Sequence, residues 1–269
     1  MLLPRLSRNA GLPVYDALMT KSFEELDYQK TPLGELVLRR RKIPMLDNEI
    51  VYEVILNDEF LMSSLFHAAE DALADLGLSA CPEGPVDVDV VVGGLGLGYT
   101  AAAALKHPKV RSLRVIEYLA PVIRWHREGL LPLGTRLADD PRLQFVHADF
   151  FASALGTAGM DPDAPGQKFH AILLDIDHTP GHWLNPTHGA LYSTEGLTAL
   201  SRSLHNDGVF AMWSDGPSDP DFLAVIGSVF RTAEAKAVRF ENPIQGGESE
   251  STVYVAAGLR ASPDRGREQ

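Results

Sequence analysis

Hydrophobic and polar positions change their period several times along the chain. Residues 1–22 lack a strong period, and we interpret them as a loose arm or a short helix. In residues 23–57, β-forming side chains flank turn residues at 31–34 and 47–48, which predicts a small antiparallel meander. Residues 59–77 place apolar side chains at helical spacing, and this predicts a helix that ends at Gly77.

From there on, apolar runs of strand length alternate with segments of helical period. The predicted strands are 86–94, 110–118, 142–150, 169–177 and 209–214, and the predicted helices are 101–106, 120–131, 194–208 and 219–230. Gly208 is at the place of a C-terminal glycine cap. Two late strands, 235–242 and 251–258, predict a hairpin.

This alternation predicts an α/β fold with a doubly wound, mostly parallel sheet. The predicted domains are an N-terminal arm with a small antiparallel β-domain (1–57), an α/β domain (58–258) and a flexible tail (259–269). Ligands of such sheets bind beyond the carboxyl ends of the strands, so residues at those ends are the candidates for function.

Composition narrows the choice of partners. The 269 residues include 36 acidic and 24 basic side chains, a net charge of −12, which argues against nucleic acid and suits cationic small molecules. A single cysteine, Cys81, excludes an internal disulfide and a cysteine metal site. Neither a signal-peptide pattern nor an apolar run of about 18 residues is present, so we expect a cytoplasmic protein without membrane contact.

Three successive strand ends carry residues suited to an adenosine. The first central strand leads into Gly93, Gly94, Gly96 and Gly98, where glycine permits positive φ and close approach of a ligand to the backbone. The second and third strands end near two acids. We expect Glu117 to accept hydrogen bonds from the ribose hydroxyls and Asp149 to accept one from the adenine amino group. Each acid alone is equally explained as a solvated strand end or a helix cap.

These residues do not by themselves distinguish NAD from S-adenosylmethionine. A dinucleotide fold usually repeats its mononucleotide-binding half, whereas this chain has no second glycine fingerprint and ends in a predicted hairpin. The pattern therefore favours an adenosyl-sulfonium donor.

Several short motifs resemble those of the spermidine synthase (polyamine aminopropyltransferase) family, which has the class I methyltransferase fold. TPLGELVL at 31–38 is similar to the N-terminal hairpin motif of the family, and DEF at 58–60 to its DEF segment. The later segments GGLGLG, VIEY, HADF, LLDID and NDGV are similar to GGGDGG, VEID, GDG, DSxDP and the PGG turn. The likeness covers roughly residues 24–257.

The resemblance implies roles for matching residues. The glycine turn would hold the methionine-derived tail of the donor, with Glu117 on the ribose and Asp149 on the adenine. Asp175, at the end of the fourth strand, would accept a proton from the attacking amine, a step that alkylation of an ammonium group needs in any case. The family also implies a homodimer.

The acceptor half of the site departs from the family. Gly96 replaces the aspartate of GGGDGG, and Met62-Ser63 replace a Tyr-His pair. The second aspartate of DSxDP falls at His178, one residue after Asp177. The loop that follows Asp175 is predicted to be a lid, with Asp177 and His178 as further catalytic candidates and His182, Trp183, His188 and Tyr192 around them. Its histidine spacing matches no metal-ligand pattern, so we expect no metal site.

We therefore predict a transferase that uses S-adenosylmethionine or decarboxylated S-adenosylmethionine and a small acceptor, which we expect to be an amine. The product of the donor would be methylthioadenosine after aminopropyl transfer and S-adenosylhomocysteine after methyl transfer. A non-catalytic adenosyl-binding protein and a nicotinamide dehydrogenase are the alternatives.

Overall fold

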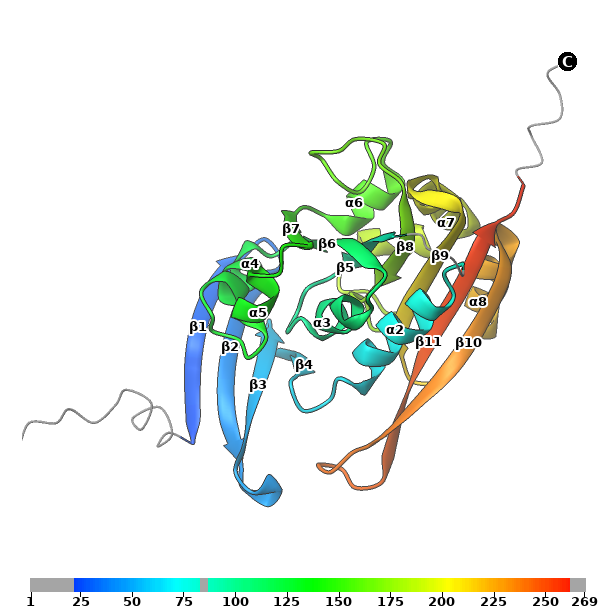
Figure 1. Ribbon diagram of the computed structural model, residues 1–269. Coiled ribbons are helices and arrows are strands. Elements are labelled where there is room, and N and C mark those ends of the chain that lie inside the picture. The colour runs from blue at the N-terminus through cyan, green and yellow to red at the C-terminus, as the bar shows by residue number, and fades with distance from the viewer. Residues whose placement is uncertain (1–21, 83–86, 262–269) are drawn as a thin grey trace, which may run out of the picture. The chain divides into compact units, whose positions relative to one another are not determined.

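Two β-sheets form the framework of the protein in a computed structural model that describes residues 22–82 and 87–261 (Figure 1). The predictions for the N-terminal arm, residues 1–21, and for most of the tail, residues 262–269, lie outside the described residues. The chain separates into two compact units between Leu61 and Met62.

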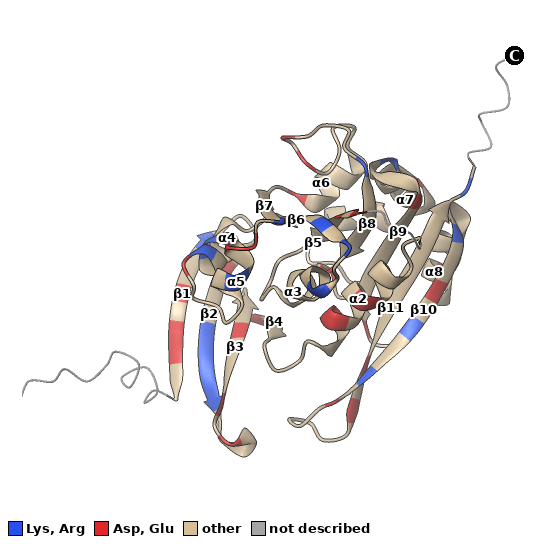
Figure 2. Ribbon diagram, viewed as in Figure 1, with Lys and Arg blue, Asp and Glu red and all other residues tan. Residues whose placement is uncertain are grey.

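The first sheet has the order β1-β2-β3-β4 and lies in the N-terminal unit except for the last two residues of β4. Its strands are β1 (Phe23–Thr31), β2 (Gly34–Ile43), β3 (Glu49–Leu56) and β4 (Glu59–Ser63), with a 3-10 turn, η1 (Pro44–Leu46), before β3. β2 pairs antiparallel with both neighbours, which confirms the predicted meander. Figure 2 shows the basic residues of β2, two of which, Arg39 and Arg41, bind the buried Glu53 at 2.7 and 2.8 Å.

The predicted helix at 59–77 is wrong in its first turns. Asn57 and Asp58 both have positive φ, 51° and 64°, and such a two-residue turn returns the chain as a hairpin. Residues Glu59–Ser63 therefore form β4, and the helix α2 begins at Ala68 and runs through Gly77 to Ser79. The turn overrides the helical spacing of the apolar side chains.

The second sheet has seven strands in the order β10-β11-β9-β8-β5-β6-β7. Its strands are β5 (Val88–Gly93), β6 (Val110–Glu117), β7 (Leu143–His147), β8 (Phe169–Leu174), β9 (Leu204–Asp215), β10 (Phe230–Glu241) and β11 (Glu248–Leu259). Strands β5 to β9 pair in parallel, and β11 is antiparallel to both β9 and β10. The predicted doubly wound sheet and the late hairpin are confirmed.

Helices cover both faces of this sheet (Figure 1). They are α2, α3 (Tyr99–Lys106), α4 (Ala120–Arg127), α5 (Gly134–Ala138), α6 (Phe150–Leu155), α7 (Thr194–Leu200) and α8 (Pro220–Val229), with the 3-10 segments η2 (Pro186–Tyr192) and η3 (Ser201–Ser203). On one face, α2 lies so close to β8 that a Cβ on Gly77 would be 2.6 Å from Leu173. On the other, Phe150, Phe222 and Ile226 pack with the sheet residues Val91 and Ile172.

The predicted helix at 194–208 ends early. α7 stops at Leu200, β9 already begins at Leu204, and Gly208 lies inside that strand rather than at a helix cap. Between β8 and β9 the register jumps from Phe169–Leu204 to Ala171–Val209, so residues 205–208 form an irregularity in the strand. Polar residues and a glycine are common both at helix ends and in bulges of strands. The sequence pattern therefore did not distinguish the two.

Two short helices were not predicted. α5 follows α4, which ends at Arg127 rather than near Leu131, and α6 begins directly after Asp149. Among the described residues, no helix has the length and apolar character needed to cross a membrane.

Candidate functional site

The glycine loop between β5 and α3 lies at the carboxyl end of the central strand. Gly94, Gly96 and Gly98 have positive φ of 92°, 48° and 91°, a region that side chains other than glycine rarely occupy. At Gly94 the space is also closed, because a Cβ there would be 2.1 Å from the carbonyl oxygen of Asp175. Gly98 is the N-cap of α3 and offers no capping side chain, so the first N–H groups of this helix keep their capacity to bind a ligand.

Glu117 ends the neighbouring strand β6 and holds this loop directly. Its side chain is 9% exposed and accepts hydrogen bonds from the backbone N–H of Leu95 at 3.0 Å and of Leu119 at 2.7 Å. Burial raises the pKa of Glu117, although backbone N–H groups lower it. The backbone N–H groups of Gly96 and Tyr118 also lower this pKa, so the carboxylate is held by the loop on both sides, and its contact with ribose hydroxyls stays a prediction.

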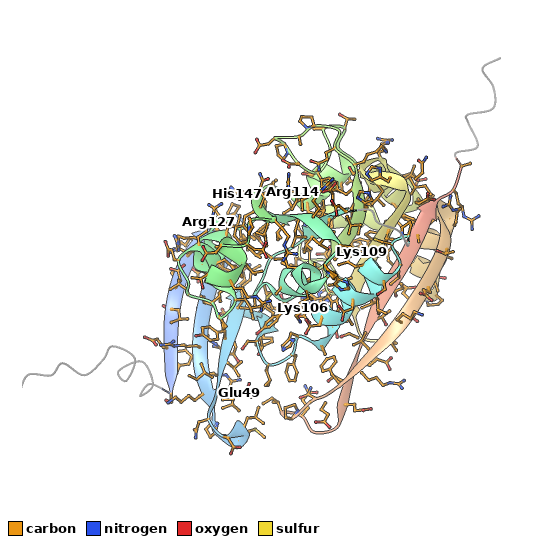
Figure 3. The ribbon with its side chains drawn as sticks, in the orientation of Figure 1. Glu49, Lys106, Lys109, Arg114, Arg127 and His147 are labelled. Carbon is orange, nitrogen blue, oxygen red and sulfur yellow. The ribbon has the colours of Figure 1, made fainter. Side chains whose placement is uncertain are left out.

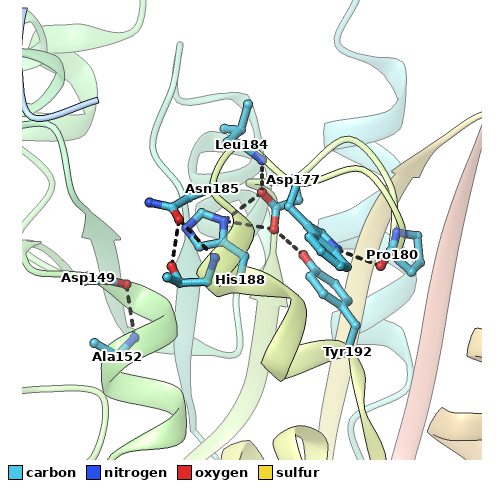
Figure 4. Close-up of polar contacts among 10 residues, drawn as sticks. Asp149, Ala152, Asp177, Pro180, Leu184, Asn185, His188 and Tyr192 are labelled. Carbon is cyan, nitrogen blue, oxygen red and sulfur yellow. Dashed lines mark hydrogen bonds and ion pairs between the residues drawn. The ribbon is translucent and has the colours of Figure 1, made fainter. Parts of the chain in front are cut away.

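Asp149 follows β7, the next strand in the sheet, and is half-buried. Its carboxylate accepts a hydrogen bond from the N–H of Ala152 at 3.1 Å and caps α6 (Figure 4). His147, at the end of β7 (Figure 3), hydrogen-bonds the carbonyl of Tyr118 at 3.0 Å and ties this strand end to that of β6. The cap explains the carboxylate without a ligand, so its contact with adenine stays a prediction.

Asp175 follows β8 on the other side of the glycine loop. Its N–H donates to the carbonyl of Gly93 at 2.8 Å, and its carboxylate accepts a hydrogen bond from the Thr100 hydroxyl in α3 at 2.6 Å. Burial raises the pKa of Asp175 to about 6, while the Thr100 hydrogen bond lowers it. The glycine loop, Glu117 and Asp175 thus come together at adjacent strand ends.

Glu70 is a functional candidate that the sequence analysis missed. It lies in the first turn of α2, where Figure 2 shows an acidic helix start, next to Asp71. Burial, followed by the charge of Asp175, raises the pKa of Glu70 to about 8. The sequence contained a signal, since Glu70 precedes the buried Leu73 by three residues and thus lies beside the apolar stripe of the helix.

Asp177 is buried in a network of hydrogen bonds within its own loop. It is 2% exposed and accepts hydrogen bonds from the N–H of Leu184 at 2.8 Å, from His188 Nδ1 at 2.9 Å and from the Tyr192 hydroxyl at 2.8 Å (Figure 4). The His188 ring stacks on Phe151 with 3.6 Å between centroids. The carboxylate therefore organises residues 177–192, and its catalytic role stays a prediction.

The other predicted lid residues gather in the same loop. His178 and His182 have ring centroids 5.0 Å apart, and the carbonyl of His178 accepts a hydrogen bond from the N–H of Asp215 at 2.7 Å. This bond joins the loop to the end of β9. Trp183 is partly exposed and donates through Nε1 to the carbonyl of Pro180 at 2.7 Å. The contact of His178 with an acceptor stays a prediction.

We expect Tyr192→Phe to destabilise the protein by about 1.5–3 kcal/mol, because it removes a hydrogen bond to a buried carboxylate. Denaturant unfolding monitored by circular dichroism measures this loss. Tyr118→Phe is the matched control, since Tyr118 is 41% exposed, and it should leave stability within about 0.5 kcal/mol of the wild type. Equal stability of both variants would show that the Asp177 network does not hold the loop.

No family model matches the chain. A curated relative, a polyamine aminopropyltransferase of Pyrobaculum calidifontis, is 25% identical over 183 residues, which are 67% of this chain and 57% of the relative. The chain thus spans less than two thirds of the length of the relative that it matches.

Two solved structures share the fold. One is a spermidine synthase in complex with the transition state analogue AdoDATO (TM-score 0.65, 18% identity, 87% of this chain and 73% of that chain). The other is the spermidine synthase of Thermotoga maritima (TM-score 0.63, 18% identity, 87% and 72%). The relative confirms the resemblance to a spermidine synthase-like family, and the structures confirm the fold.

Proposed function

From the resemblance to the spermidine synthase-like family, we propose that this protein transfers an alkyl group from an S-adenosylmethionine-type sulfonium to a small amine. Aminopropyl transfer from decarboxylated S-adenosylmethionine is the reaction we favour, because the curated relative carries the name of that activity. The homodimer and the cytoplasmic location stay predictions.

The observation that carries the proposal is the pair of carboxyl groups beside the glycine loop. Burial raises the pKa of Asp175 to about 6, and burial together with the charge of Asp175 raises that of Glu70 to about 8, so both carboxyl groups change their charge near neutral pH. An ammonium group bound beside them would favour the charged form of both carboxyl groups. Asp175 is then a carboxylate poised to accept a proton near neutral pH.

The residues around the pair have separate tasks in the proposed reaction. The glycine loop and Glu117 hold the adenosyl group, whose sulfonium supplies the carbon under attack. Thr100 fixes one oxygen of Asp175 through its 2.6 Å hydrogen bond, so that the free oxygen can take the proton from the amine nitrogen. The N–C bond forms as the C–S bond breaks, and positioning supplies the remainder of the acceleration.

The carboxyl pair also predicts a pH dependence of stability without ligand. A carboxyl group with a raised pKa in the folded state binds more protons there than in the unfolded chain between the two pKa values, so stability falls as pH rises. For Glu70 and Asp175 the loss runs from about pH 4 to pH 8. We expect Glu70→Gln to reduce this fall in melting temperature, measured by calorimetry at pH 5, 6.5 and 8.

Asp163→Asn is the control for that measurement, because Asp163 lies in an exposed part of the loop before β8. It should retain the wild-type slope. An unchanged slope in Glu70→Gln would remove Glu70 from the proposed site.

Methyl transfer is a second candidate, favoured by one observation. The spermidine synthase family has an aspartate at the position of Gly96. Here the Met62 side chain fills the space beside this position, since a Cβ on Gly96 would be 2.5 Å from the Met62 sulfur. No carboxylate can enter at this position without displacing Met62. A donor whose tail needs a carboxylate at this position would therefore find no such partner there.

Analysis of the donor product tests the proposal. The protein is incubated with S-adenosylmethionine or its decarboxylated form and a panel of mono- and diamines, and the adenosyl product is identified by mass spectrometry. Methylthioadenosine supports aminopropyl transfer and S-adenosylhomocysteine supports methyl transfer. A thermal shift with adenosyl compounds but no product would indicate a binding protein, and a shift with NAD alone would indicate a dehydrogenase.

A further inference from the structure

His126 lies on α4, directly beneath the glycine loop, and the sequence analysis gave it no part in the site. Its side chain is 0% exposed, and Nε2 is 2.9 Å from the carbonyl oxygen of Gly96. A carbonyl only accepts hydrogen bonds, so Nε2 must carry the proton and donate. The other ring nitrogen, Nδ1, is buried, and no described residue gives it a hydrogen bond.

These contacts fix the tautomer of the ring. A proton on Nδ1 would be a buried donor without an acceptor, which is costly, so the neutral form with hydrogen on Nε2 is the stable one. Burial also lowers the pKa of His126, although the hydrogen bond to Gly96 raises it. The contacts thus assign His126 the role of a neutral donor through Nε2.

The loop is thus fastened at two successive residues from the same β6–α4 segment. Glu117 accepts the N–H of Leu95 at 3.0 Å, and His126 donates to the carbonyl of Gly96. The ring also packs against Gly98, where a Cβ would be 2.8 Å from its Cε1. A glycine-rich loop has many accessible conformations, and these contacts select the one in which Gly96 has a φ of 48°.

We propose that His126 is a positioning residue for the donor: its Nε2–H holds the Gly96 carbonyl and keeps the glycine loop in the conformation that receives the sulfonium tail. This inference rests on the proposed function, since it concerns the same donor. In this proposal, the buried His126 of α4 fixes the conformation of a loop whose three positive-φ residues are glycines and have no side chains to fix it.

Two variants separate the hydrogen bond from the volume of the ring. His126→Leu fills similar space without a donor, and His126→Gln restores an N–H. We expect His126→Leu to weaken the binding of methylthioadenosine and S-adenosylmethionine about 10-fold, measured by calorimetric titration, and His126→Gln to recover most of it. His107→Leu, at the far end of α3 where His107 pairs with Asp75, should bind as the wild type does.

The outcomes distinguish this inference from the proposed function. Equal affinity in all the variants would overturn the positioning role and leave the transferase intact, as would a nitrogen NMR spectrum of the wild type showing the proton on Nδ1. If both His126→Leu and His126→Gln lower the stability of the protein and His126→Gln does not recover ligand affinity, His126 has a packing role only. If the wild type binds neither adenosyl compound, the proposed function fails, and the donor role of His126 fails with it.

Discussion

Replacing Asp175 with asparagine is expected to reduce turnover by about 10²–10⁴-fold, the usual contribution of a general base, while the affinity for the adenosyl donor stays unchanged. Asparagine keeps the shape of the side chain and an oxygen that can accept the Thr100 hydrogen bond, but it cannot take a proton. Single-turnover kinetics with the amine identified in the product assay, together with titration of methylthioadenosine, measure the two quantities separately.

The pH profile gives a second criterion for Asp175. Because burial raises its pKa to about 6, kcat/KM of the wild type should rise with pH through this value as the carboxyl group loses its proton, and Asp175→Asn should lose that limb. Asp163→Asn, in an exposed part of the loop before β8, is the control and should keep full activity. Full activity of Asp175→Asn would refute its role as the base.

Gly94→Ala should destabilise the protein far more than an alanine at another glycine with the same backbone conformation. Both Gly94 and Gly166 have positive φ, 92° and 77°, but a Cβ on Gly166 meets nothing within 4 Å. Gly166→Ala therefore bears only the left-handed strain, about 1–2 kcal/mol. Gly94→Ala adds a clash with the backbone carbonyl of Asp175, which costs about 1–3 kcal/mol more.

Denaturant unfolding of the two variants gives this difference, and calorimetric titration tests its consequence for the site. A shift of Gly94 away from Asp175 displaces the loop from the strand end, so we expect Gly94→Ala to lose donor binding and Gly166→Ala to keep it. Similar unfolding free energies for the two variants would mean that the loop has room to move, contrary to the structure.

Sequence patterns predicted the parallel sheet correctly because its strands are short, apolar and separated by helical segments. Local periodicity and the global fold agree there. They failed where a turn contradicted the period. Asn57 and Asp58 direct Glu59–Ser63 into a strand although the apolar spacing there is helical. The same happened at Gly208, where a bulge inside β9 looked like a helix cap.

The candidate site divides in the same way. Gly94, Glu117 and Asp175 could be placed from sequence because each directly follows a strand, and the carboxyl ends of parallel strands meet at one edge. Glu70 could not, since its partner Asp175 is 105 residues away along the chain and belongs to another element. His126 also escaped, because a histidine on a helix gives no local sign of the carbonyl that it binds.

By itself, then, the sequence determined the alternation of strands and helices in the large sheet, the placement of Gly94, Glu117 and Asp175 at its strand ends, and the acidic character of the chain. Each of these depends on residues close to one another in the sequence. The tertiary structure decided which side chains face each other across elements. It brought Glu70 within the electrostatic reach of Asp175, buried Asp177 in hydrogen bonds to its own loop, and placed His126 against the carbonyl of Gly96. Those outcomes depend on burial and on contacts between distant segments, which set pKa values and tautomers and which no local pattern encodes.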